Sequence, residues 1–184
     1  MAKLTRRAFG AGLLGTSLAA CSNGIGNGNA SVIDARVAST LSFMTDNYPG
    51  TKSLRERSSG MLVMPLVTGV GLGLGGSYGR GALVVGESVV DYYSVASGSA
   101  GLQIGAQQYS HVLFFMTPEA LMDFRSSPGW SAGGNIEYAI NDQGETLRAE
   151  TITSLSPVIA VIFAQAGLRI GATLEGSKYT RIIP

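Results

Sequence analysis

The stretch GVGLGLG at residues 69–75 alternates glycine with valine or leucine, inside a segment, residues 60–116, whose apolar residues recur with a period of two. That period is typical of β-strands, because successive side chains of a strand point to opposite faces of the sheet. Glycine along one face lets a helix or another backbone approach closely. Short strands with close connections favour an antiparallel meander, and Pro65 is expected to end the first strand. The predicted strands are residues 61–64, 70–75, 81–85, 89–95, 98–107 and 110–116.

Helices are predicted on both sides of this segment. Before it, Ser31 can cap a helix that Tyr48-Pro49-Gly50 stops, and residues 51–57 could add a short charged turn. After it, Thr117-Pro118-Glu119 supplies an N-cap, a first-turn proline and a first-turn acid. The apolar stripe of the first helix is Ile33, Val37, Leu41, Met44 and Tyr48.

The remainder of the chain is β-rich. Its predicted strands are residues 136–140, 157–163, 167–174 and 179–183. The β content exceeds what one layer of helices could cover on both sides. We therefore expect an α+β domain in which a curved, mostly antiparallel β-sheet packs against two or three helices.

The first twenty residues have the features of a cleaved export signal. Arg6 and Arg7 make its start positive, and the apolar run at residues 10–19 is too short to span a bilayer. Paired arginines followed by Phe9 are typical of a twin-arginine signal, which a receptor reads as an address. Leu18-Ala19-Ala20-Cys21 matches a lipobox, in which signal peptidase cuts before a cysteine that carries diacylglycerol.

These features predict a signal peptide at residues 1–20, a flexible tether at residues 21–30 and one domain at residues 31–184. Lipidated Cys21 would anchor the domain to the cell envelope. Ser22 favours sorting to the periplasmic face of the outer membrane, in a host that has one. The alternatives are an ordinary secretory leader with a chance cysteine, and export by the general secretory route.

Charge and cysteine content narrow the class of protein. Three of the 13 basic residues lie in the leader, so residues 21–184 hold 10 basic against 12 acidic residues, a net charge of −2. A nucleic-acid-binding protein would show a basic face, so the sequence argues against nucleic acid as a partner. Cys21 is the single cysteine, so no disulfide forms within one chain.

Residues 71–76 satisfy the dinucleotide-binding pattern G-x-G-x-x-G, but their context does not fit. The pattern needs a strand before it, a helix after it and an acid about twenty residues further on. Here Pro65 interrupts the approach, residues 77–83 have no helical stripe, and Asp91 follows too closely. We interpret Gly71, Gly73 and Gly75 as structural glycines, and we expect no cofactor.

Residues 129–133 satisfy the nucleophile-elbow pattern G-x-S-x-G, which needs a histidine later in the chain. The single histidine, His111, precedes Ser131, and a hydrogen-bonded structural role suits it better. One histidine and no free thiol predict no metal cluster. A catalytic pair of carboxylates stays open, although no two acids have a spacing that would bring them together. We expect a protein that is not an enzyme.

Five blocks of sequence, in order, resemble the core of the SYLF domain family. They are GMLVMP (60–65), GLGLGGSYGRGAL (71–83), YYSVASGS (92–99), GLQIGAQ (101–107) and LFFM (113–116). Eukaryotic members of that family bind lipids, often phosphoinositides, and some fungal members bind actin. The resemblance therefore implies lipid or membrane association and no catalysis. An N-terminal amphipathic helix contributes to membrane contact in the eukaryotic members, whereas residues 31–48 here carry Arg36 as their one basic residue.

Two functions follow from these observations. The first is a membrane-anchored lipoprotein whose SYLF-like domain binds phospholipid. The alternative is a structural lipoprotein of the cell envelope that binds a protein partner. Lys52, Arg55 and Arg57 form a local basic cluster and are the candidate contacts for an anionic lipid headgroup, unless they are simply a solvated turn.

Overall fold

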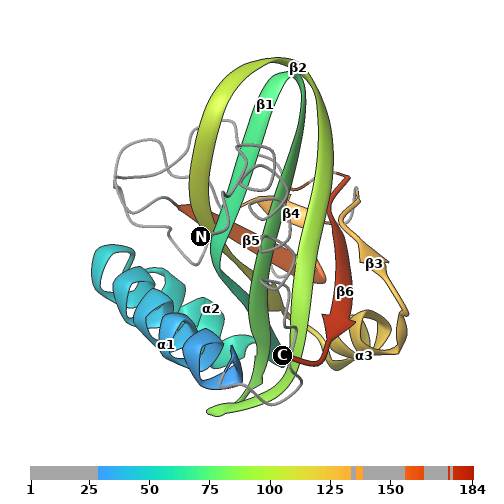
Figure 1. The fold of residues 1–184 in the computed structure, drawn as a ribbon. Coiled ribbons are helices and arrows are strands. Elements are labelled where there is room, and N and C mark those ends of the chain that lie inside the picture. Colours follow the sequence, from blue (N-terminus) through green and yellow to red (C-terminus); the bar gives the residue numbers. More distant parts are fainter. Residues whose placement is uncertain (1–28, 134–135, 139–155, 164–173, 175) are drawn as a thin grey trace, which may run out of the picture.

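The structure, a computed structural model, describes residues 29–133, 136–138, 156–163, 174 and 176–184. In these residues three helices pack against a six-stranded sheet that curls over (Figure 1). The helices are α1 (Asn29–Asn47), α2 (Thr51–Arg57) and α3 (Pro118–Ser126). The strands are β1 (Gly60–Val85), β2 (Ser88–Phe115), β3 (Trp130–Ser131), β4 (Ile136–Tyr138), β5 (Val158–Phe163) and β6 (Lys178–Ile182). The predicted α+β architecture with a curved, mostly antiparallel sheet is confirmed.

The predicted meander of short strands is wrong, because residues 60–115 form one long antiparallel hairpin. β1 and β2 pair from Gly60↔Phe115 to Val85↔Ser88, and Gly86, with φ of 60°, makes the turn between them. The Gly/Ser stretches that were expected to be turns lie opposite each other in the hairpin, with Gly76 paired to Gly98. Facing stretches of small residues let both strands bend together, so neither strand ends there.

Pro65 does not end a strand either. The pairing of β1 with β2 shifts register between Met64 and Val67, and this irregularity removes the need for a proline N–H in the ladder. The buried Ser110 hydroxyl donates to the Pro65 carbonyl at 2.7 Å, which satisfies an acceptor of the disrupted ladder. The prediction that Pro65 stops the strand failed because a β-bulge accommodates it.

The hairpin arches over and returns toward the base of the molecule, as Figure 1 shows. The returning part of β1 then presses on its own first part. A Cβ placed on Gly79 would lie 2.7 Å from the carbonyl oxygen of Leu66, and one on Gly81 would overlap the carbonyl of Val63. Glycine is therefore required where the two parts cross, as the alternation of glycines suggested. The surroundings of Gly73 lie outside the described side chains.

The second edge of β2 is shared by two strands. Its first part pairs with β6, from Tyr92↔Ile182 to Ala96↔Lys178, and its last part pairs with β5, from Ser110↔Phe163 to Phe115↔Val158. β3 adds to β6, and β4 adds to β5 in the one parallel pairing of the described strands. The predicted strand at residues 167–174 lies outside the described residues except for its last position.

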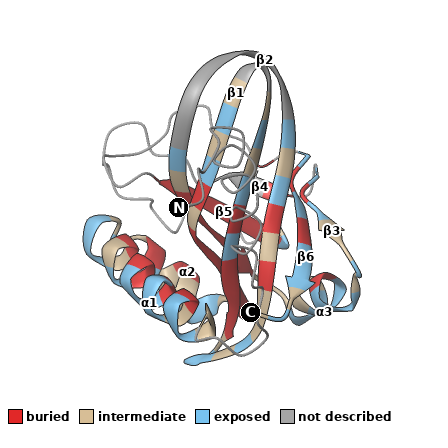
Figure 2. Ribbon diagram, in the orientation of Figure 1, coloured by how far each residue is buried: buried red, intermediate tan, exposed pale blue. Residues whose placement is uncertain are grey.

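Alternate residues of the central strands face two separate apolar layers, and both layers are buried (Figure 2). On β1, Met61 and Val63 face the layer covered by α1 and α2, whereas Leu62 and Met64 face the layer that includes Phe124 of α3. A strand that is buried on both faces needs apolar residues at every position. This requirement accounts for the continuous apolar runs that interrupt the alternating pattern of the sequence.

The predicted helices are confirmed, but Ser31 is not the cap of the first one, because α1 begins at Asn29 and Ser31 lies in its first turn. The stripe of α1 is buried except for Tyr48, which is half-buried just beyond the helix end. In α3 the Thr117 hydroxyl accepts a hydrogen bond from the Ala120 backbone N–H at 3.2 Å, with Pro118 in the first turn, as expected of an N-cap. Among the described residues no helix is long and apolar enough to cross a membrane.

Candidate functional site

The structure places Lys52, Arg55 and Arg57 on one short helix, α2. Leu54 is fully buried beneath α1 and β1 and fixes the inner side of this helix, so the flanking cations are held at the surface. The Thr51 hydroxyl donates to the Tyr48 carbonyl at 2.7 Å and joins α2 to the end of α1. The predicted basic cluster is thus a feature of one rigid element.

Arg55 forms an ion pair with Glu87. Its Nη2 donates to both carboxylate oxygens of Glu87, at 2.9 and 3.1 Å, and Glu87 lies in the β1–β2 turn. An exposed ion pair of this kind contributes little to stability. Its consequence is electrostatic: Glu87 neutralises one of the three cations. Arg57 donates from Nε to the Ser53 carbonyl at 3.1 Å, and among the described residues Lys52 makes no ion pair.

A groove runs between α1, α2 and the β1–β2 turn. It consists of two adjoining hollows of about 540 and 420 Å³, which share Thr45, Arg55, Val84 and Glu87. Lys52 and Glu56 line the first hollow at the α2 end. Apolar side chains line the second hollow, where α1 lies over the hairpin; they are Val37, Ala38, Leu41, Val84 and Val89. Asp34 and Asp46 also line the second hollow, and Glu87 lines both, so the groove has a charged end and an end where apolar side chains lie between acids.

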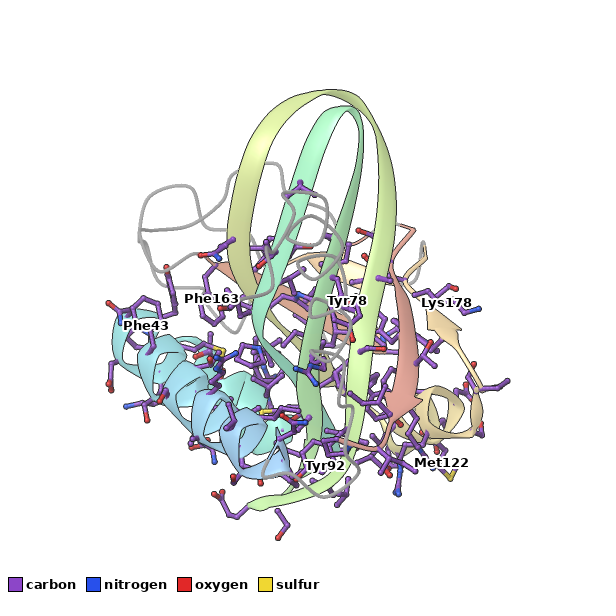
Figure 3. The ribbon with its side chains drawn as sticks, in the orientation of Figure 1. Phe43, Tyr78, Tyr92, Met122, Phe163 and Lys178 are labelled. Carbon is purple, nitrogen blue, oxygen red and sulfur yellow. The ribbon has the colours of Figure 1, made fainter. Side chains whose placement is uncertain are left out.

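The far end of the groove is fixed by a polar contact between α1 and β2. The Tyr92 hydroxyl donates to the Asp34 carboxylate, with oxygen–oxygen distances of 3.0 and 3.2 Å. Burial, together with this hydrogen bond to an anion, raises the pKa of Tyr92. At the opposite end of α1, Phe43 stacks on Phe163 of β5 with ring centroids 5.9 Å apart (Figure 3). The two contacts fix the position of α1 against the sheet.

Neither catalytic pattern of the sequence adopts its required geometry. Residues 71–76 lie within the continuous strand β1, with no strand-to-helix turn. Ser131 ends the two-residue strand β3 at the sheet edge and no helix follows it in the described residues.

His111 is fully buried, its Nε2 lies 2.8 Å from the Tyr179 hydroxyl, and burial lowers its pKa to about 3. No group of three potential metal ligands occurs in the described part of the chain.

Sequence reasoning identified the cations but missed the groove and the partner of Arg55. Glu87 is 32 residues from Arg55, and no local pattern links them. The groove exists only because α1 packs across the turn of a hairpin whose length was underestimated. Cys21, Arg6 and Arg7 lie outside the described residues.

Comparison with known protein families gives one match. Residues 96–181 match the family described as Ysc84: Las17-binding protein actin regulator. The matched range begins in the first half of β2, includes α3, and ends within β6, so it covers most of β2 and the strands after it but none of β1. No curated protein matches the chain.

Proposed function

Because the chain carries a domain of the Ysc84 family, the SYLF domain, we propose that it is a non-catalytic lipoprotein whose domain binds phospholipid at a membrane surface. In this proposal Arg6 and Arg7 direct export, and lipidated Cys21 anchors the protein to the cell envelope. The domain lies on the periplasmic face of the outer membrane where the host has one. The lipid it contacts is an anionic phospholipid.

The observation that carries the proposal is the groove with cations at one end and apolar side chains at the other. Lys52, which lines the first hollow, would meet a phosphate, and the apolar wall of α1 would meet the glycerol and the first part of an acyl chain. Arg57 lies on the same helix outside the two hollows and would contact a neighbouring headgroup. The volumes of the two hollows are in the range of small-molecule sites, about 300–1,000 Å³. The groove thus suits part of a lipid that remains in its membrane.

Anchoring makes a weak site sufficient. Because α1 begins at Asn29, the tether is shorter than the expected residues 21–30. A flexible tether of eight residues would have a root-mean-square length of roughly 16 Å, so the domain would stay close to the surface to which Cys21 attaches it. The local concentration of headgroups is then high, and a site of low intrinsic affinity is largely occupied. A low net charge in the domain is compatible with this arrangement.

A second candidate function is the binding of a protein partner. The description of the matched family names members that bind the protein Las17 and regulate actin. On the hairpin, Val70 and Tyr78 of β1 are exposed large apolar side chains, which suit a protein contact. In that case the α2 cations have no part in membrane binding.

The test compares vesicle binding of the mature chain, residues 21–184 carrying Cys21→Ser, with that of the same chain with Lys52, Arg55 and Arg57 changed to Ala. The vesicles contain phosphatidylcholine with phosphatidylglycerol. Each substitution removes one positive charge, because the loss of Arg55 leaves Glu87 unpaired, and at about 1 kcal/mol each, binding at low salt should weaken roughly 150-fold. The difference should vanish at high salt.

The matched control removes three exposed cations elsewhere, Arg36, Arg80 and Lys178, by the same substitution. It should weaken binding less than the α2 variant does. If the parent and the α2 variant bind equally, and circular dichroism shows that both are folded, the α2 cluster is not the headgroup site.

A further inference from the structure

Two arginines from different elements converge on one aspartate at the end of the sheet. Arg125 of α3 and Arg181 of β6 place their Nη2 atoms 3.3 and 3.4 Å from Asp91 Oδ2. Neither contact has hydrogen-bond geometry, because Asp91 Oδ2 has no hydrogen-bond partner among the described residues. The cluster therefore holds a net charge of +1, and most guanidinium donors remain available.

The arginines are accessible and have exposed apolar neighbours. The side chains of Arg125 and Arg181 are 45% and 52% exposed. Met122 is 62% exposed and lies three residues before Arg125, on an adjoining part of the α3 surface. Ile183 is 81% exposed and lies two residues after Arg181, directly beyond the end of β6. Cations beside exposed apolar side chains are typical of a surface that enters a lipid headgroup layer.

The surroundings of the pair favour an anion. The hydroxyl of Tyr93 is buried without a hydrogen-bond partner among the described residues, and the Arg181 guanidinium carbon lies 6.0 Å from the centre of the Tyr93 ring. Tyr93, and then Asp91, raise the pKa of Arg181. The two acids of α3, Glu119 and Asp123, lie roughly 120° and 160° around the helix axis from Arg125, so they face away from the pair.

The cluster lies at the same end of the molecule as the β1–β2 turn. Asp91 follows Glu87 by four residues along the start of β2, or about 13 Å of extended chain. In Figure 3, Tyr92 and Met122 lie at this common end. The α2 groove opens on one face of the sheet and the arginine pair on the other, with the turn between them.

We propose that Arg125 and Arg181, with Met122 and Ile183 beside them, form a second contact with anionic lipid phosphates, so that the domain docks on the membrane by the end that carries the β1–β2 turn. This inference rests on the proposed function and adds an orientation to it. Two guanidinium groups can hold phosphate oxygens with several N–H donors, and the apolar side chains enter the acyl boundary. The phosphate would take the place of the poorly oriented contacts to Asp91.

A purely structural role for the cluster predicts different behaviour. If Asp91 only fastens α3 and β6 to β2, its neutralisation gives no more than the general gain from removing one negative charge, which Asp123→Asn measures. If Asp91 competes with lipid phosphate, its neutralisation frees both arginines and gives a larger gain. The effect of Asp91→Asn relative to that of Asp123→Asn therefore separates the two roles.

The experiment measures binding to phosphatidylcholine vesicles with and without phosphatidylglycerol, in mature chains, residues 21–184, that all carry Cys21→Ser. At low salt, Arg125→Gln with Arg181→Gln should weaken binding to anionic vesicles roughly 30-fold, and Asp91→Asn should strengthen it roughly fivefold. Met122→Ser with Ile183→Ser should weaken binding at low and high salt alike, roughly tenfold, because apolar contacts are not screened. The control Arg36→Gln with Arg80→Gln removes the same charge from other surfaces.

Each outcome decides a separate point. Two outcomes overturn the second contact, provided that circular dichroism shows an intact fold. One is binding by Asp91→Asn that is no stronger than binding by Asp123→Asn, and the other is an equal loss of binding in the Arg125/Arg181 variant and its control. If the α2 variant alone loses binding, the proposed function stands and this inference fails. If the parent does not bind anionic vesicles, both fail.

Discussion

The hydroxyl of Tyr179 lies 2.8 Å from Nε2 of His111 and joins β6 to β2 inside the core. Both side chains are buried, and the Nδ1 of His111 has no partner among the described residues. The chain's single histidine is thus a structural group that is held neutral. Its titration gives a direct reporter of core integrity.

Acid should destabilise the fold through His111. Burial lowers its folded pKa to about 3, below the ordinary 6.5, so between these values the unfolded chain binds more protons than the folded chain. Stability is then fully present above pH 6.5 and falls toward pH 3, by about 1.4 kcal/mol per pH unit from this group. Urea unfolding of the parent and of His111→Gln from pH 7 to pH 4 measures it. The same pH slope in both proteins would contradict the assignment.

Gly81 should tolerate no side chain. A Cβ there would overlap the carbonyl of Val63 and press on the sulfur of Met64, so Gly81→Ala should destabilise the domain by at least 1 to 3 kcal/mol, roughly the cost of overpacking. Gly98 lies in β2, where an added Cβ would meet nothing within 4 Å, and Gly98→Ala is the matched control. Thermal melts of the two variants should differ clearly. Equal melting temperatures would mean that the crossing of β1 over itself is wrong.

Neutralising Glu87 should strengthen membrane binding. Glu87→Gln releases Arg55 and removes a negative charge beside the groove, so binding to anionic vesicles at low salt should rise roughly fivefold. Asp123→Asn removes the same charge from the other face of the sheet and should have a smaller effect. An unchanged or lower affinity of Glu87→Gln would place lipid elsewhere than at the α2 groove.

Lipidation of Cys21 remains a prediction of the sequence. Cys21→Ala should leave the protein unprocessed or soluble, because diacylglycerol with an N-acyl chain gives firm anchoring where one chain is marginal. Salt-washed membrane fractions, probed for the protein, measure the loss. Retention of the Cys21→Ala protein in those fractions would refute the lipoprotein assignment.

Local features of the fold were predictable from the sequence. The stripe of α1 and the Thr117 cap of α3 depend on residues within one or two turns, so their spacing carries the information. The strand character of residues 60–115 was also clear from the period of two. What failed was the length of the strands, because Pro65 and the Gly/Ser stretches carry turn signals that pairing across the hairpin overrides.

Long-range features were not predictable. The partner of Arg55 and the convergence of Arg125 and Arg181 on Asp91 join residues 32 to 90 positions apart, brought together only by the pairing of β2 with β1 and β6. The basic cluster on α2 was found from sequence, but its neutralised member was not. Charge counts along a chain cannot show which cations remain unpaired after folding.

The central claim is that the folded domain recognises anionic phospholipid. The most direct measurement is vesicle co-flotation of the mature chain, residues 21–184 carrying Cys21→Ser, with phosphatidylcholine alone and with increasing phosphatidylglycerol, at low and high salt. We predict binding that grows with the anionic fraction and weakens with salt. Absence of binding to every vesicle, or equal binding to neutral and anionic vesicles by the folded protein, would contradict the account.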